Sequence, residues 1–170
     1  ALRSSPQIEG FKKRGIEVLL LNDHVDDFWT NVTLKYGETP FKSVLRASKD
    51  FDKEEAEAEK PPAAIGVLID AMKELYGAEV HDVRTTKRLA DSPVCLAINE
   101  GDMDMRMERF LAEHNQLPAR RPKILEVNAE HPLIQKLAEK HDHDTMWLLL
   151  DQARIAEGEQ PGDIAAFLSR

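Results

Sequence analysis

Two consecutive prolines, Pro61 and Pro62, constrain the fold of this chain more than any other feature. They end a charged run rich in Ala and Glu, and a Pro-Pro step interrupts regular secondary structure. A run of this kind is typical of a solvated helix or a flexible linker, and its charges carry no functional signal by themselves. We therefore expect two folded parts, over 1–49 and 64–170, joined by a charged linker or helix over 50–63.

The first part predicts a helix, a strand and a second helix in succession. Ser5 and Pro6 are typical of a helix start, and the helix is expected to end before Gly15. The nearly continuous apolar run over 16–21 predicts a strand that is buried on both faces. A second helix is expected from Asn22, because apolar residues then recur at helical spacing. This order predicts a small α/β/α unit.

The second part predicts a mixture of helices and strands that ends in helices. Apolar residues at helical spacing, followed by Gly77, predict a helix over 65–75. Runs that are rich in β-branched or alternating residues predict three strands, over 79–84, 93–98 and 123–127. Helix-like composition predicts four more helices, over 102–114, 132–140, 145–157 and 163–168. The expected class is thus α/β followed by α+β, with a three-stranded sheet in the second part.

Charge and hydropathy argue against several classes of partner. The formal net charge of -8 repels a polyphosphate backbone, and no Lys/Arg cluster offsets it, so we expect no nucleic-acid partner. No apolar run approaches the roughly 20 residues that span a bilayer, so we expect no membrane partner. The single cysteine, Cys95, has apolar neighbours and is expected to be a packed thiol in a reducing compartment, which predicts a cytoplasmic protein. A chain that opens at Ala1 is consistent with an excised fragment.

The sequence contains none of the common catalytic motifs. It has no glycine-rich phosphate loop, no Gly-x-Ser-x-Gly elbow, no Cys-x-x-Cys pair and no His-Glu-x-x-His. We therefore expect no enzyme, and no catalytic, cofactor-binding or metal-binding residues. The run from His141 to Asp144 is expected to be a hydrophilic loop in which Asp144 caps the next helix. A small metal-dependent hydrolase built around His141 and His143 is the alternative, although no third ligand has a recognisable spacing.

One predicted helix has a face that is rich in methionine. Met103, Met107, Phe110 and Leu111 share one side of this helix, and charged residues fill the other side. Such a face usually packs into the domain's own core, as in a purely structural module. Exposure is the alternative, because methionine is flexible and polarizable and suits a surface that accepts many apolar partners. The pattern alone leaves both interpretations open.

Several long stretches of the sequence are specific enough to indicate a family. They are, in chain order, Ser5–Leu21, Pro40–Val44, Val80–Arg84, Arg88–Pro93, Ile124–Asn128 and Leu148–Ala153. In sequence and in order they resemble the bacterial ninety-kilodalton heat-shock chaperone family of the HtpG type. The resemblance covers nearly the whole chain.

The resemblance implies a division of the chain and a function for it. Residues 1–49 resemble the last α/β/α piece of the family's middle domain, incomplete at its start, and 64–170 resemble its carboxy-terminal dimerisation domain. Family members bind ATP with magnesium in an amino-terminal domain that has no counterpart here. The resemblance therefore implies a chaperone fragment without ATPase activity or a cofactor of its own. The implied partners are a second copy of the chain and unfolded or partly folded client proteins.

The same resemblance implies which residues carry these roles. In the family, the Met-bearing helix contacts clients, and this helix matches the methionine-rich face defined above. A neighbouring client patch in the family matches Asp27, Phe28 and Asn31. The last two helices of each family protomer pack into a four-helix dimer bundle. The matching residues here are Leu149, Leu150, Ala153, Ile164, Phe167 and Leu168.

Overall fold

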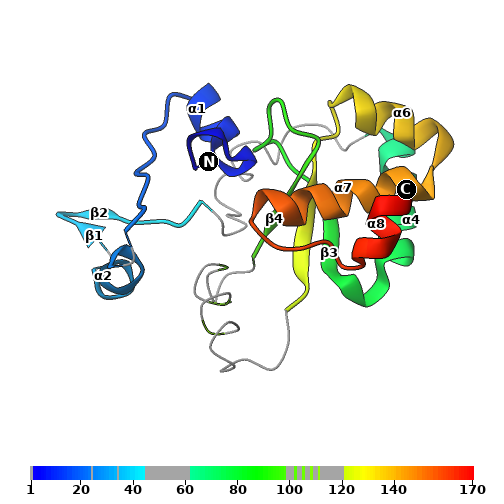
Figure 1. The fold of residues 1–170 in the computed structure, drawn as a ribbon. Coiled ribbons are helices and arrows are strands. Elements are labelled where there is room, and N and C mark those ends of the chain that lie inside the picture. Colours follow the sequence, from blue (N-terminus) through cyan, green and yellow to red (C-terminus); the bar gives the residue numbers. More distant parts are fainter. Residues whose placement is uncertain are drawn as a thin grey trace.

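The computed structural model of the chain describes most of its residues. The described residues are 2–23, 25–33, 35–44, 62–98, 102, 105, 108, 111 and 121–170. They form helices and two sheets, so the mixed class expected from the sequence is confirmed (Figure 1). The connection expected over 50–63 lies outside the described residues, apart from Pro62 and Ala63.

The chain begins with the predicted helix. Two short 3-10 helices, η1 (Leu2–Ser4) and η2 (Pro6–Ile8), lead into α1 (Glu9–Lys13). The hydroxyl of Ser5 accepts a hydrogen bond from the backbone N–H of Gln7 at 3.3 Å. Gly15 adopts a φ of 69°, a conformation that is unfavourable for residues other than glycine. The predicted cap and the predicted stop are both confirmed.

The predicted strand over 16–21 is wrong. These residues form no regular element, and Ile16, Leu19 and Leu20 are exposed, with Leu19 at 59%. A strand needs a neighbour that completes its hydrogen bonds, and no described segment pairs with this one. The apolar run that suggested the strand is real, but the described part of the chain does not cover it.

A helix and a small hairpin complete the first part. The predicted second helix is confirmed as α2 (Asp26–Val32). Two strands that the sequence analysis did not predict, β1 (Lys35–Tyr36) and β2 (Thr39–Pro40), pair in antiparallel fashion around Gly37, which has a φ of 59°. Their residues are all exposed, so no alternating pattern marks them in the sequence.

All three strands predicted for the second part are confirmed and form one sheet. They are β3 (Val80–Thr85), β4 (Val94–Ala97) and β5 (Lys123–Val127). The order β3-β5-β4 puts β5 in the centre, parallel to β3 and antiparallel to β4. Every residue of β5 is buried.

The helices around this sheet begin and end close to the predicted residues. They are α4 (Ala63–Tyr76), which continues into η3 (Gly77–Glu79), then α6 (Pro132–Lys140), α7 (His143–Ala156) and α8 (Ile164–Ser169). The predicted cap at Asp144 is wrong. The residue that precedes α7 is Asp142, and its carboxylate accepts the backbone N–H of Thr145 at 3.0 Å.

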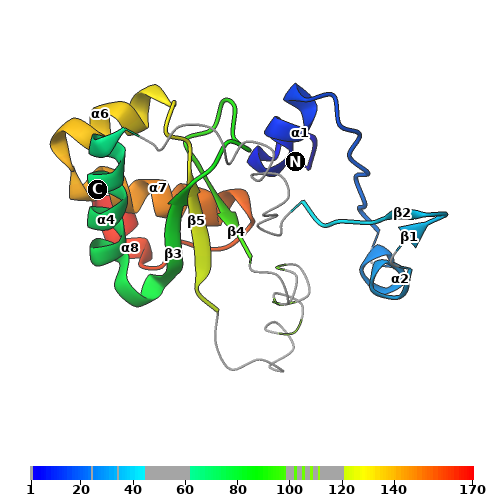
Figure 2. The same ribbon diagram turned by 180° about the vertical axis from the view of Figure 1, so that it is seen from behind.

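The core of the molecule lies between the sheet and the helices (Figures 1 and 2). Side chains alternate along β5, so Leu125 and Val127 join the apolar core, while Glu126 points to the other face. The helices contribute four side chains that are fully buried at 0% exposure: Leu68, Met72, Ile134 and Met146. Both views place the first turns of the chain beside β4 and the loop that precedes it.

Replacing the central core residue should destabilise the chain strongly. Leu125→Ala removes a side chain with 0% exposure, so we expect the free energy of unfolding to fall by about 2–5 kcal/mol. Leu133→Ala on α6 is the matched control, because Leu133 is 38% exposed and should cost less than about 1 kcal/mol. Denaturant unfolding measures both values. Equal losses in the two variants would contradict the assignment of the core.

Candidate functional site

The sheet has a buried carboxylate at its centre, on Glu126. Its Oε1 accepts a hydrogen bond from Nη2 of Arg84 at 2.8 Å, and its Oε2 accepts one from Nε of Arg88 at 2.9 Å. Arg88 is only 1% exposed and also donates to the backbone carbonyl of Val44. Because guanidinium groups bond both carboxylate oxygens, this cluster is built to hold segments together rather than to transfer a proton.

The thiol of Cys95 lies against the same carboxylate. Its Sγ is 3.8 Å from Oε2 of Glu126, and the side chain is buried. Burial, and then the negative charge of Glu126, raise the pKa of the Cys95 thiol well above its ordinary range. The group therefore stays protonated at neutral pH, which excludes a thiolate nucleophile and confirms the expected packed thiol.

The carboxylate of Glu9 docks α1 onto the loop before β4. Its Oε2 accepts the backbone N–H groups of Ala90, Asp91 and Ser92 at 2.9, 2.9 and 3.0 Å, and its Oε1 accepts the Ser92 hydroxyl at 2.5 Å. Burial alone would raise the pKa of Glu9, but these hydrogen bonds outweigh it and lower the pKa below its ordinary value near 4.5. The first helix is thus fixed to the second part of the chain by an ionised group.

Two neighbours of Glu9 reinforce the docking. Gln7 is 1% exposed, and its Nε2 donates to the carbonyl of Leu96 and, at 3.1 Å, to the carboxylate of Glu157. Gly10 faces the backbone of Arg88, where a Cβ atom would collide with the carbonyl group. Only glycine allows α1 to approach this closely.

The Met-bearing helix is described at three positions. Met105, Glu108 and Leu111 are helical, which agrees with the predicted helix. Met105 and Glu108 are buried, with exposures of 3% and 7%, and Leu111 is half-buried. The other predicted client residues of this helix, Met103, Met107 and Phe110, lie outside the described residues.

The second predicted client patch lies on α2. The backbones of Asp27, Phe28 and Asn31 belong to this helix, while their side chains lie outside the described part of the structure. The side chain of the neighbouring Trp29 contacts other residues of the first part of the chain. Its indole N–H donates to the carboxylate of Asp26 at 2.8 Å. Its ring meets the edge of the Phe41 ring at a centroid distance of 5.8 Å.

The six predicted dimer residues divide into two groups. Leu149, Leu150 and Ala153 on α7 are buried in the core of the single chain, so this conformation does not offer them to a second copy. On α8, Ile164 and Leu168 are exposed by 52% and 78%, and Phe167 is half-buried. The exposed apolar surface of the terminal helices also includes Ile155, at 47%.

A buried carboxylate anchors α8 and its connection to α7. Asp151 is 1% exposed and accepts the backbone N–H of Gly162 at 3.2 Å and an N–H of Arg170 at 3.4 Å. The guanidinium of Arg170 also lies over the ring of Trp147, 5.1 Å from its centroid. These contacts hold the residues at the two ends of α8, Gly162 before it and Arg170 after it, to α7.

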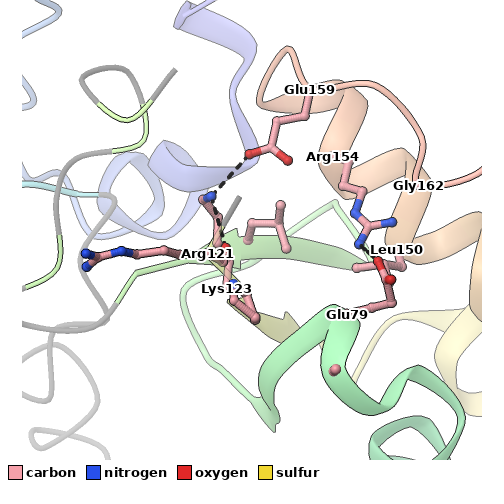
Figure 3. Close-up of a pocket in the computed structure, with 10 residues that line it drawn as sticks. Glu79, Arg121, Lys123, Leu150, Arg154, Glu159 and Gly162 are labelled. Carbon is pink, nitrogen blue, oxygen red and sulfur yellow. Dashed lines mark hydrogen bonds and ion pairs between the residues drawn. The ribbon is translucent and has the colours of Figure 1, made fainter. Parts of the chain in front are cut away.

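A pocket of about 270 Å³ opens between the sheet and the connection from α7 to α8 (Figure 3). Both basic and acidic side chains line this pocket. Arg154 donates to the carboxylate of Glu79 at 2.7 Å, and Nζ of Lys123 lies 3.3 Å from a carboxylate oxygen of Glu159. Arg154 and Lys123 are thus already paired, and the third basic residue of the lining, Arg121, lies 4.0 Å from a carboxylate oxygen of Asp102.

The histidines of the expected loop serve as helix ends. His141 ends α6 in the left-handed region, with a φ of 51°, and His143 is the first residue of α7. Among the described residues, no group of three or more His, Cys, Asp or Glu side chains could hold a metal ion. None of the described helices is long and apolar enough to cross a membrane.

Comparison with known proteins identifies the class. The family model for Hsp90 protein matches residues 1–170, and the chain therefore belongs to the Hsp90 family. It is 45% identical to the chaperone protein HtpG of Roseobacter denitrificans, over 99% of this chain and 30% of that protein. The corresponding proteins of Paramagnetospirillum magneticum and Wolbachia pipientis wMel are 44% and 41% identical, over 99% and 100% of this chain and 30% and 29% of their own lengths. The chain thus spans about 30% of the length of these relatives.

Sequence reasoning missed the residues that hold the two parts together. Glu126 carries the only available signal, because a charged residue inside an apolar strand has to find a partner. Nothing in the sequence pattern names Arg88 as that partner, or pairs Glu9 with the loop before β4, because these contacts join residues that lie far apart along the chain.

The docking of α1 should depend on the charge of Glu9. A carboxyl group whose pKa is lowered by folding stabilises the fold above its ordinary pKa near 4.5, and this contribution is lost as the pH falls through the lower pKa of the folded state. Glu9→Gln should lower the free energy of unfolding at pH 7 by about 1 kcal/mol. The difference from the unmodified chain should shrink below pH 4.5.

Denaturant unfolding between pH 3 and pH 7 tests this prediction. Glu74→Gln is the matched control, because Glu74 is exposed on α4 and makes no such contact with the loop before β4. A Glu9→Gln difference that stays constant across this pH range would overturn the assigned role of the Glu9 charge.

Proposed function

We propose that this chain is the part of a cytoplasmic chaperone that joins two protomers into a dimer. It also contributes part of the surface that binds client proteins. It carries no ATPase activity and no nucleotide or metal cofactor. Residues 1–49 correspond in this proposal to the end of the middle domain, and 64–170 to the carboxy-terminal dimerisation domain. Membership of the Hsp90 family and the relatives named HtpG support this function.

The burial of Met105 and Glu108 is the observation that carries the client-binding proposal. An α-helix turns by about 100° per residue. In a helical projection of the sequence, Met103, Met107 and Phe110 therefore fall on the side away from these two buried residues. A helix that is held to the molecule through Met105 and Glu108 presents its opposite face outward, and here that face is rich in flexible apolar side chains.

The terminal helices support the dimerisation proposal. Ile155, Ile164 and Leu168 are apolar and exposed, and they follow one another along α7 and α8. A symmetric contact between two copies would remove these side chains from water in both protomers at once. In this arrangement three residues of α7 contribute to the interface indirectly, because they pack the helix onto the core of its own chain: Leu149, Leu150 and Ala153.

Replacing the apolar face should weaken client binding strongly without unfolding the chain. The variant Met103→Ser, Met107→Ser, Phe110→Ser removes the surface that an unfolded chain would contact, so we expect its affinity for a reduced, carboxymethylated protein to fall by roughly ten-fold or more. Fluorescence anisotropy measures that affinity, and circular dichroism checks the fold.

A matched control replaces an apolar side chain elsewhere. Val67→Ser changes a residue of α4 that is 57% exposed, and its affinity should stay near that of the unmodified chain. If the triple variant bound the probe unchanged and remained folded, the helix would be a structural element only. If the triple variant lost its fold, the face would belong to the core.

A further inference from the structure

One buried ammonium group joins two segments that are far apart in the sequence. The side chain of Lys123, at the start of β5, is 7% exposed. Its Nζ lies 3.0 Å from Oε2 of Glu108 and 3.3 Å from Oε1 of Glu159. Glu108 belongs to the Met-bearing helix, and Glu159 to the connection between α7 and α8. Figure 3 shows the Lys123 amine directed toward Glu159.

Because these charged groups are buried, the fold depends on their staying paired. The side chains of Glu108 and Glu159 are themselves only 9% and 15% exposed. An ammonium group removed from water needs its carboxylate partners close by, because an unpaired buried charge is strongly destabilising. If either segment moves away, the Lys123 charge loses a partner that water cannot fully replace.

A second hydrogen bond fixes how the Met-bearing helix sits on the sheet. Oε1 of Glu108 accepts the backbone N–H of Arg121 at 2.9 Å, while its Oε2 holds Lys123. Both donors belong to the same short stretch of chain at the entry to β5, the central strand. Glu108 therefore sets the rotation of its helix about the helix axis, and this rotation decides which face points outward.

We propose that Lys123 is a positioning residue that couples the client face to the terminal helices. The proposal rests on the functions proposed above for these two surfaces. The ammonium group holds Glu108 and Glu159 at once, so a displacement of the α7–α8 connection changes the support of the client helix. Coupling between two sites is reciprocal, so a client bound to that helix also alters the terminal helices.

A double-mutant cycle on the two carboxylates tests the shared ammonium directly. In Glu108→Gln or in Glu159→Gln, Lys123 keeps one ionised partner. In the double variant it keeps none. We therefore expect the melting temperature of the double variant to fall by clearly more than the sum of the two single losses. Additive losses would overturn the proposal, because the two carboxylates would then act independently.

In a Lys123→Met background, the effect of each single Gln replacement should reverse its sign. Two buried carboxylates without their cation repel each other, so either Gln replacement should raise the melting temperature, and the second should add less than the first. The cycle that retains Lys123 decides the question alone if Lys123→Met does not fold. If either Gln replacement still lowered the melting temperature in the Lys123→Met background, the proposal would also be overturned.

A binding measurement separates this proposal from the proposed function. Glu159→Gln should weaken the binding of the carboxymethylated probe by about five-fold, although residue 159 lies outside the client helix. Glu139→Gln, on the exposed side of α6, should leave binding unchanged. If the Met-face triple variant loses binding while Glu159→Gln does not, the coupling is refuted and the client face stands. If the triple variant binds unchanged, the client face is refuted instead.

Discussion

The buried carboxylate of Glu126 is the interaction on which the arrangement of this chain depends. An ionised group in the centre of a sheet is tolerated only if strong donors reach it, and here two arginines do so from β3 and from the loop that follows it. Arg88 extends the cluster to the carbonyl of Val44, at the end of the first part of the chain. Alternative packings would leave the charges of this cluster unpaired and buried, which disfavours those packings. Holding Arg88 also shapes the loop whose backbone N–H groups bind Glu9.

The surfaces proposed for dimerisation and for client binding are those that this internal network of contacts does not use. The inner side of α7 is committed to the core, and Asp151 holds the α7–α8 connection and the last residue, Arg170. Among the described residues, apolar side chains of α8 such as Leu168 are exposed instead. The proposal for the Met-bearing helix follows the same logic, because its residues Met105 and Glu108 are buried against the molecule. Lys123 contacts both Glu108 of the Met-bearing helix and Glu159 of the α7–α8 connection, so one side chain joins these two segments.

Local rules predicted most of the fold, and contacts between distant residues explain what they missed. Helix boundaries at Ser5, Gly15 and Gly77 follow from capping and from the freedom of glycine, and the three strands of the main sheet follow from their apolar pattern. The strand over 16–21 was wrong because its pattern says nothing about whether a pairing partner is present. The predicted dimer residues on α7 were identified as apolar, but several sides of this helix are apolar, and the sequence does not show which side faces the chain's own core. Charged contacts such as that of Glu126 were missed because the sequence does not show which distant residues come together in the fold.

The central claim, that the terminal helices join two copies of the chain, is tested most directly by sedimentation equilibrium over a wide range of concentrations. The account predicts a dimer that dissociates on dilution. It also predicts that Leu168→Asp weakens association by about ten-fold or more, because a charge replaces an exposed apolar side chain in the contact. Val32→Asp, an equally exposed apolar position on α2, should associate like the unmodified chain. A strict monomer at every concentration, or equal weakening by both variants, would contradict the account.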